Sequence, residues 1–136
     1  MPYFADAAEV YRYIGGAFRL AADHPEAGPR LRAVGATLRI EYRDPAATLT
    51  LRLRAEGVEI IEGQSDLPAD IHLSMTADNG NRFWRGEYNA ALGLAKGEAR
   101  ARGPIAKILK VLPAAKPVFP LYRELIAAKE QAGETK

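Results

Sequence analysis

The residue types that most often carry chemistry are sparse in this chain. Its 136 residues include no cysteine and two histidines, His24 and His72, which stand far apart in the sequence. Without cysteine the chain cannot form a disulfide, a thiolate zinc site, an iron–sulfur cluster or a thiol nucleophile. No Walker A loop, Gly-x-Ser-x-Gly elbow or His-Glu-x-x-His motif occurs. We therefore predict no catalytic residue, no metal site and no cofactor, which means a protein that is not an enzyme.

The remaining polar candidates favour structural interpretations. His72 falls on the polar side of an alternating segment, and no neighbour is evident that would orient it as a general base. His24 precedes Pro25, which is typical of the end of a helix. Three acids surround a loop rich in Gly, Ser and Pro, but their spacing lacks the glycine and the bidentate glutamate of a calcium loop: Glu62, Asp66 and Asp70. We interpret them as solvated loop charges.

Length, charge and hydropathy narrow the class of protein. At 136 residues the chain is expected to be a single domain, residues 1–136. Nineteen basic and seventeen acidic side chains leave a formal charge of +2, too little to argue for nucleic acid. The N-terminus lacks the pattern of a signal peptide, and no apolar run approaches the ~18 residues of a membrane span. We expect a soluble, cytoplasmic protein.

Alternation of apolar and polar residues predicts a one-layer sheet. Five segments alternate, at residues 36–43, 48–54, 58–63, 70–76 and 97–103, and the short turns between the first three predict an antiparallel meander. Each segment is apolar on one side only, whereas a sheet covered on both sides would have continuous apolar runs. The fold class predicted is α+β, a five-stranded, mostly antiparallel sheet with helices covering one face.

Helical patterns supply that cover. An amphipathic helix is predicted over residues 4–22, followed by a Pro/Gly-rich loop to Arg32, and its Gly15-Gly16 pair suggests close approach of another backbone. Thr76 and Asn89 are predicted to cap two short helices, the second ending at Gly97. A further helix follows Pro104, and a proline-interrupted segment, residues 113–136, ends in a last helix with Leu121, Tyr122, Leu125 and Ile126 inward.

Arginines are concentrated on the polar face of the sheet: Arg39, Arg43, Arg52, Arg54, Arg100 and Arg102. Glutamates share this face, so one interpretation is a ladder of cross-strand ion pairs. The other is weak attraction to an anionic membrane surface or an acidic head group. The face offers no exposed aromatic residue for base stacking, so we predict no nucleic-acid partner.

The apolar residues pose the more informative question. Four strands carry large side chains on the inner face, but the fifth carries only Ala99 and Ala101. The helices opposite are rich in large apolar residues. The two alanines could let a helix pack closely, or they could leave room for the chain of a ligand.

A resemblance bears on that choice. Residues 69–112 resemble the sterol carrier protein type 2 domain, a family of intracellular lipid-binding modules. The segment Ala69–Thr76 reads as a strand ending in a helix cap. Phe83-Trp84, Gly86, Ala90-Ala91-Leu92, Gly97 and Gly103 follow in the family's order. The resemblance implies a hydrophobic tunnel between sheet and helices that takes fatty acids, acyl-CoAs, sterols, phospholipids or isoprenoid lipids.

The resemblance also implies a set of lining residues: Met75, Phe83, Trp84, Leu92, Leu94, Ala99, Ala101, Ile105, Ile108, Leu109, Leu112, Phe119 and Leu125. Lys107 and Lys110 would meet a head group at the mouth, and residues 113–136 would form a lid or plug. The implied function is an intracellular lipid carrier, with transient membrane contact, as a monomer or homodimer. The alternative is a non-catalytic interaction or dimerisation module, or a subunit that presents lipid, for example isoprenoid quinone precursors, to an enzyme.

Overall fold

The structure, a computed structural model, describes residues 2–134. The order of helices and strands matches the predicted one with two additions, a short helix directly after the first helix and a 3₁₀ helix in the proline-interrupted segment. Their bounds are α1 Ala7–Asp23, α2 Ala27–Arg32, β1 Ala36–Arg43, β2 Ala47–Arg54, β3 Gly57–Glu62, β4 Ile71–Thr76, α3 Ala77–Trp84, α4 Ala90–Lys96, β5 Arg100–Arg102, α5 Ile105–Val111, the 3₁₀ helix η1 Leu112–Val118, and α6 Phe119–Glu134.

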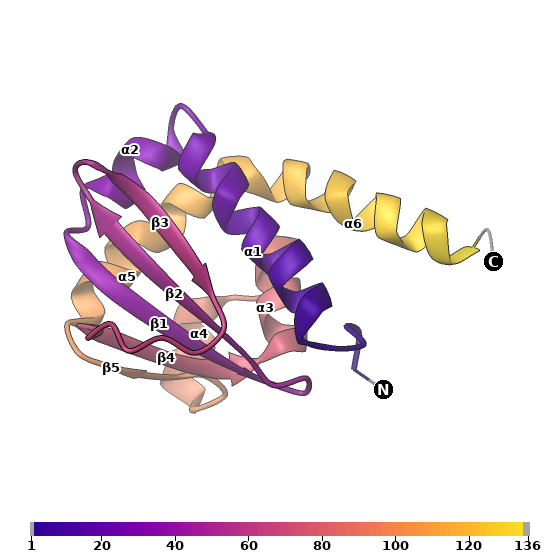
Figure 1. The fold of residues 1–136 in the computed structure, drawn as a ribbon, viewed down its shortest axis with the longest axis horizontal. Helices are drawn as coiled ribbons and strands as arrows, with labels where there is room; N and C mark the ends of the chain where they lie inside the picture. Colours follow the sequence, from indigo (N-terminus) through magenta and orange to yellow (C-terminus); the bar gives the residue numbers. More distant parts are fainter. Residues whose placement is uncertain (1, 135–136) are drawn as a thin grey trace.

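The five strands form one sheet in the order β3-β2-β1-β4-β5 (Figure 1). The central strand β1 pairs with β2 in the antiparallel sense and with β4 in the parallel sense, while β2–β3 and β4–β5 are antiparallel. The register places Leu38 beside both Leu51 and Ile71. Because alternate side chains share a face, the apolar residues of these strands form one continuous inner surface. The predicted α+β class and the β1–β2–β3 meander are confirmed.

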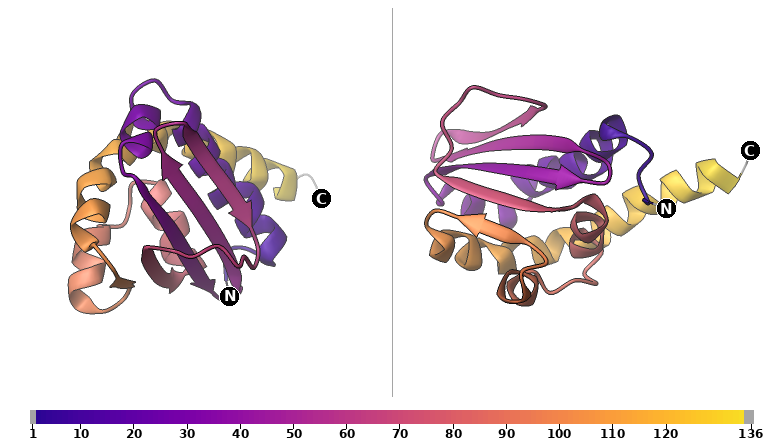
Figure 2. Two further views of the ribbon diagram at one scale, coloured as in Figure 1. Left: turned by 60° about the vertical axis from the view of Figure 1, so that its left-hand side comes forward. Right: turned by 90° about the horizontal axis from the view of Figure 1, so that it is seen from below.

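The two faces of the sheet are covered differently. The helices gather on the inner side (Figure 2), while the segment joining β3 to β4 crosses the other side. Arg39 on that outer side donates hydrogen bonds to the Thr50 hydroxyl and to the Leu67 carbonyl of this segment. The Thr37 amide donates to the Asp70 carboxylate at 2.8 Å. This extended crossover leaves Thr50 fully buried, although it lies on the polar side of its strand.

The first helix packs tightly against the sheet. It begins after Asp6, whose carboxylate accepts a hydrogen bond from the amide of Glu9, and it buries Val10 and Ile14 completely. A Cβ added to Gly16 would lie 3.2 Å from Cδ2 of Leu125 on α6. The glycine pair therefore makes room for side chains, with Arg19 beside Gly15, and the expected close approach of a second backbone is wrong.

Residues 27–32, predicted as loop, form helix α2. The ring nitrogen Nδ1 of His24 accepts hydrogen bonds from the amides of Glu26 at 3.0 Å and Ala27 at 3.3 Å. It therefore satisfies amides at the start of a helix that lacks the usual Ser, Thr, Asp or Asn cap. A Cβ on Gly28 would stand 2.5 Å from the Ala22 carbonyl oxygen. Glycine at this position lets α2 turn back closely against the end of α1.

The C-terminal segment continues without a break from α5 through η1 into α6. Tyr122 and Ile126 of α6 are buried, Leu125 is half-buried, and Leu121 is 37% exposed. The predicted inward orientation of Leu121 is therefore wrong, because it precedes the buried Tyr122 and faces solvent. The later turns of α6 extend past the rest of the fold (Figure 1). None of the helices within residues 2–134 is both long enough and apolar enough to cross a bilayer.

Candidate functional site

A cavity of about 100 Å³ lies between the inner face of the sheet and helices α3, α4 and α5. Its wall is almost wholly apolar. The lining residues are Phe18, Leu38, Ile40, Tyr42, Leu73, Met75, Gly80, Phe83, Trp84, Tyr88, Ala90, Leu94, Ala99, Ile108, Val111 and Leu112. The strands β1 and β4 form its floor, and the helices form its sides and roof. Apolar walls of this kind do not hold ordered water, so the cavity is suited to a hydrophobic guest.

Helix α3 positions the aromatic side of the cavity. The Thr76 hydroxyl, at the end of β4, accepts a hydrogen bond from the Asn79 amide at 3.1 Å, as predicted for a helix cap. The helix therefore begins directly above the sheet. The ring centroids of Phe83 and Trp84 lie 5.2 Å apart at nearly right angles, and Phe18 from α1 meets Trp84 at 5.1 Å. Edge-to-face packing of this kind fixes the rings against one another and makes this wall rigid.

Helix α4 and the residue before β5 form a thinner wall, to which Ala90, Leu94 and Ala99 contribute. Asn89 caps α4 by accepting from the Leu92 amide at 3.0 Å, and Gly97 ends the helix in the left-handed conformation at φ 79°, both as predicted. Within α4 only Gly93 is buried, and no residue of β5 is fully buried. Ala99, which immediately precedes β5, lines the cavity and is 5% exposed. Because few large side chains point inward on this side of the molecule, space for a ligand remains there.

A larger hollow of about 650 Å³ adjoins the cavity, and we call it the vestibule. Four residues line both spaces: Phe83, Tyr88, Ala90 and Leu112. The vestibule is open to solvent and includes polar groups from Glu87, Asn89 and Lys116. The two spaces together provide an apolar inner chamber and, at its mouth, an outer chamber lined by both apolar and polar groups.

Tyr88 stands at the junction of the two chambers. Its hydroxyl donates to the Glu98 carboxylate at 3.0 Å, and its ring lies over Gly93, where an added Cβ would be 2.0 Å from the hydroxyl oxygen. Only glycine at position 93 leaves room for this arrangement. Partial burial, together with the hydrogen bond to Glu98, raises the pKa of Tyr88 above its ordinary value, so the hydroxyl keeps its proton at neutral pH.

The structure brings together just over half of the lining residues implied by the sequence. Met75, Phe83, Trp84, Leu94, Ala99, Ile108 and Leu112 line the cavity. Leu109 and Phe119 line the vestibule. The other four lie outside both chambers: Leu92 and Ile105 are exposed, Ala101 is half-buried beside Leu73, and Leu125 packs against Gly16. The helices α4 and α5 have only seven residues each, so an apolar spacing does not determine which side of them faces inward.

The two lysines expected at the mouth lie elsewhere. Lys107 and Lys110 line a separate groove with Arg30 of α2, and Val111 lies between this groove and the cavity. The cation at the vestibule is instead Lys116 of η1. Nine further residues that line the cavity were not predicted: Phe18, Leu38, Ile40, Tyr42, Leu73, Gly80, Tyr88, Ala90 and Val111. Alternation placed Tyr42 on the inner face, and this was the signal that could have identified it.

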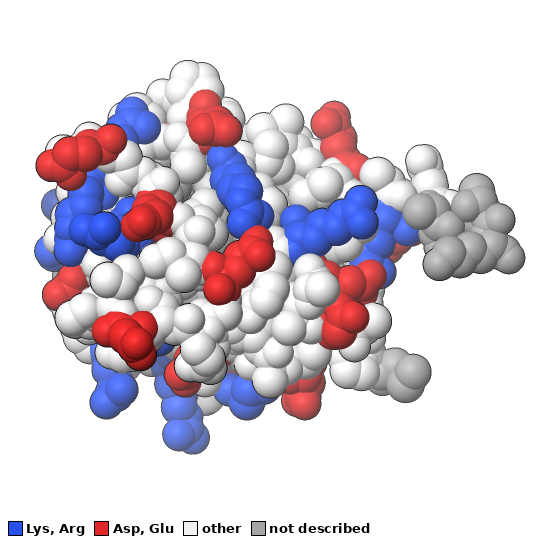
Figure 3. Space-filling view, viewed as in Figure 1, with Lys and Arg blue, Asp and Glu red and all other residues white. Residues whose placement is uncertain are grey.

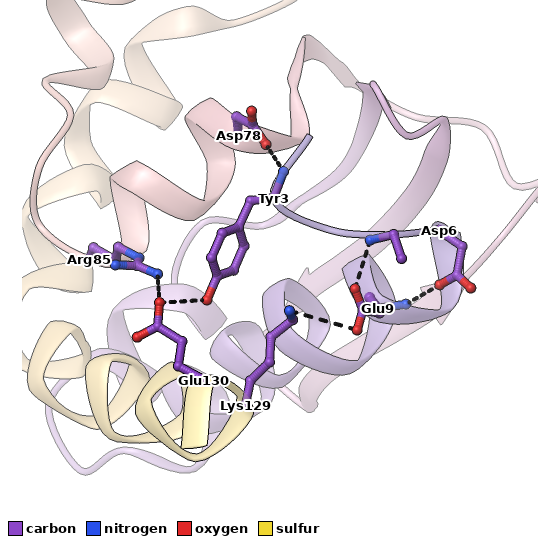
Figure 4. Close-up of polar contacts among 8 residues, drawn as sticks. Tyr3, Asp6, Glu9, Asp78, Arg85, Lys129 and Glu130 are labelled. Atoms are coloured by element: carbon purple, nitrogen blue, oxygen red, sulfur yellow. Dashed lines mark hydrogen bonds and ion pairs between the residues drawn. The ribbon is translucent and has the colours of Figure 1, made fainter. Parts of the chain in front are cut away.

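A set of polar contacts fastens α6 to the N-terminal segment and to α3 (Figure 4). Glu130 of α6 accepts hydrogen bonds from the Tyr3 hydroxyl at 3.1 Å and from Arg85 at 3.3 Å, and Lys129 lies 3.8 Å from the carboxylate of Glu9. The amide of Tyr3 donates to Asp78 on α3. We call these six residues the α6 clasp. Nearby, the buried Tyr122 hydroxyl donates to Asn81 at 2.7 Å.

Several of the other polar candidates have structural partners. On the outer side of the sheet, Arg52 pairs with Glu59 of the neighbouring strand at 3.3 Å, which is the one cross-strand ion pair of the predicted ladder among the described residues, and Arg54 lies 3.9 Å from Asp70, just before β4. Arg43 donates to the Ser74 hydroxyl. Acidic and basic side chains are also interspersed over the face seen in Figure 3. Among the described residues, no three His, Asp or Glu side chains gather as a metal site would require.

Comparison with known proteins places this arrangement in a family. The sequence model of the SCP-2 sterol transfer family matches residues 17–116, and the chain therefore belongs to that family. No curated protein matches the sequence closely enough to count as a relative. This membership confirms the resemblance noted in residues 69–112 and extends it toward both ends of the chain.

Solved structures show the same fold at low sequence identity. The sterol carrier protein domain 2 of Helicoverpa armigera superposes with a TM-score of 0.67 at 9% identity, over 88% of this chain and 95% of that one. Sterol carrier protein 2 from Yarrowia lipolytica, in its apo form, gives 0.61 at 18% identity, over 85% and 98%. A structure described as the UbiJ-SCP2 ubiquinone synthesis protein gives 0.61 at 18%, over 87% and 95%.

Proposed function

We propose that this protein binds a lipid, with the hydrocarbon chain in the cavity and the polar end in the vestibule. The observation that carries the proposal is the junction between the two chambers. An apolar space between sheet and helices opens, through four shared residues, into a solvent-exposed space with polar groups. Membership in the SCP-2 sterol transfer family supports a hydrophobic ligand. The protein acts by holding the lipid, and no side chain is assigned a chemical step.

The size of the cavity constrains how a lipid would bind. At about 100 Å³ it is smaller than the ~150 Å³ cavity that holds one benzene molecule in an engineered protein. A long chain must therefore extend through the junction into the vestibule, or displace part of the roof. Each buried CH₂ contributes about 0.8 kcal/mol, and association costs ~4–15 kcal/mol. We expect modest affinity and broad chain specificity, because one methylene changes binding by only ~1–3 kcal/mol.

Helix α5 is the part of the roof best suited to move. It buries a single residue, Ile108, and it follows Gly103, whose φ of 104° marks a turn at the end of β5. The last helix is held by the α6 clasp and by the buried Tyr122. Exchange of the lipid would thus involve displacement of α5 and of the Tyr88 ring, with α6 remaining in place. A plug formed by residues 113–136 is not part of this proposal.

Substitution at the junction tests the proposal. Ala90 is half-buried and lines both chambers, so Ala90→Trp is expected to fill the junction and to lower the affinity for a fluorescent fatty acid at least tenfold. The matched control is Ala95→Trp, at an exposed position of the same helix, which should bind as the wild type does. Equal affinity of the two variants would contradict the placement of the ligand. Circular dichroism and the midpoint of thermal unfolding verify that both variants are folded.

The proposed lipid carrier has a second candidate function beside it, and the lipid that co-purifies with the protein distinguishes the two. Likeness to the UbiJ-SCP2 ubiquinone synthesis protein favours a subunit that presents an isoprenoid lipid to enzymes. The aromatic rings of Phe83 and Tyr88, which line both chambers at their junction, would suit an aromatic head with a prenyl tail. Native mass spectrometry followed by organic extraction separates the cases. Fatty acids or phospholipids favour a general carrier, a prenylated ring favours the presenting subunit, and a lipid-free stable dimer favours an interaction module.

A further inference from the structure

The outward side of α5 has two chemically distinct flanks. Ile105 is 39% exposed and Leu109 is 46% exposed, although both are large apolar residues. At 100° per residue they lie within about 40° of each other around the helix, while Lys107 and Lys110 lie on the opposite flank with Ala106 between the two pairs. The buried Ile108 faces the other way, toward the cavity. The helix therefore presents an apolar edge and a cationic edge to solvent.

The cationic edge continues into a groove. Lys107 and Lys110 line it with Arg30 of α2, and its remaining wall consists of Ala33, Val34 and Val111, with no acidic residue. Within residues 2–134, none of the three cations takes part in an ion pair. This contrasts with Arg52 and Arg54 of the sheet, which both pair with carboxylates. A concave site lined by cations alone attracts an anionic surface, because the positive potentials of the three side chains add.

The apolar edge lies next to the mouth of the proposed site. Leu109 lines the vestibule, and Val111 lines both the cationic groove and the cavity. The exposed apolar residues, the unpaired cations and the mouth are thus parts of one short helix and its immediate surroundings. A helix of seven residues is too short to span a bilayer, but an apolar edge flanked by lysines is typical of segments that lie in the head-group region.

We propose that α5 and the Arg30 groove form a docking surface for an anionic phospholipid bilayer, which brings the vestibule against the membrane. The proposal rests on the lipid-binding function for its purpose, but its three cations, Arg30, Lys107 and Lys110, line neither the cavity nor the vestibule. In the docked state Ile105 and Leu109 enter the interface, and the three cations contact lipid phosphates. Because α5 is also the weakly packed part of the roof, contact with the bilayer would act directly on the element that covers the cavity.

Vesicle binding tests the docking surface. The full chain is sedimented with vesicles of phosphatidylcholine alone, or of phosphatidylcholine with phosphatidylglycerol, at low and at high salt. Wild type should bind only the vesicles with phosphatidylglycerol, and less so at high salt. Each basic residue near an anionic surface contributes about fivefold in partitioning, so Lys107→Glu with Lys110→Glu should reduce binding about 25-fold or more. Failure of wild type to prefer the anionic vesicles would overturn the proposal.

A control of equal charge makes the test specific to this surface. Arg43→Glu with Arg100→Glu changes the net charge by the same amount on the outer side of the sheet, where both arginines are exposed. This variant should retain most of the binding, and an equal loss in the two double variants would refute docking through α5. At high salt, Ile105→Asn should bind the vesicles more weakly than wild type does. Leu121→Asn, which changes an exposed leucine of α6, should bind as wild type does.

A second readout separates this inference from the proposed function. Binding of a fluorescent fatty acid is measured in solution without vesicles, where the Lys107→Glu, Lys110→Glu variant should match wild type. Loss of vesicle binding with unchanged fatty-acid binding supports the docking surface. If wild type binds the vesicles as expected but takes up no fatty acid, the docking surface is retained and the lipid-binding function is overturned.

Discussion

The two halves of the helical layer are built on different principles. Where α1, α3 and α6 meet, large side chains fill the interior: Val10, Ile14, Val118 and Tyr122 are fully buried, and the α6 clasp closes the outer edge. Around α4, β5 and α5 the buried residues are few, namely Gly93, Ala99 and Ile108, and two hollows remain. One half of the layer therefore supplies stability while the other half retains space, and three experiments test that division.

The largest effect is expected in the filled half. Tyr122→Ala removes a buried ring and its hydrogen bond to Asn81, so it should lower the free energy of unfolding by about 4 kcal/mol. The neighbouring Leu121→Ala removes an exposed side chain and should cost less than about 1 kcal/mol. Urea denaturation followed by circular dichroism measures both. Similar losses for the two variants would show that α6 is not anchored as described.

A smaller effect is expected where space remains. Ile108→Ala deletes the one buried contact of α5, and the helix can settle inward, so the loss of stability should be about 2 kcal/mol. Ile14→Ala in α1 should cost about 4 kcal/mol, because its surroundings are filled and cannot collapse. The same denaturation experiment compares them. The division between the two halves is wrong if Ile108→Ala proves the more damaging substitution.

The smallest effect concerns pH and the α6 clasp. Partial burial, followed by the hydrogen bond to Glu130, raises the pKa of Tyr3 from 10.0 to about 12. Since the folded state favours the neutral phenol, this contribution to stability is fully present below pH 10 and is lost as pH rises toward 12. Wild type should therefore lose stability more steeply than Tyr3→Phe between these values. Parallel curves of unfolding free energy against pH would contradict this role for Tyr3.

Much of the fold could be predicted from the sequence because its signals were local. Alternation identified the strands, and the caps Thr76 and Asn89 and the stop at Gly97 were all located correctly. Helix α2 was missed because its first amides bond to the ring of His24, a contact that no spacing rule describes. The parallel pairing of β1 with β4 also depends on contacts between distant segments.

The candidate site was harder to predict than the fold. Residues at i, i+3 and i+4 on α5 suggested one inward stripe, yet Ile108 is buried while Ile105 and Leu109 face solvent. The apolar spacing of a two-turn helix does not determine which side faces inward, and the strand that precedes it, β5, has only three residues. Lys107 and Lys110 were misplaced for the same reason, since the rotation that exposes Ile105 and Leu109 carries the lysines to the Arg30 groove.

The side chains that line the cavity near α4 and β5 have a consequence for how this protein can diversify. Ala90, Leu94 and Ala99 contact the hollow from segments that bury little else. Substitutions that change the size of the side chain at these three positions would reshape the cavity with little effect on the free energy of unfolding. Under the proposed function, these three side chains would shape the choice of ligand while most of the stability comes from α1, α3 and α6, so natural variation or directed evolution could alter ligand preference with the fold intact.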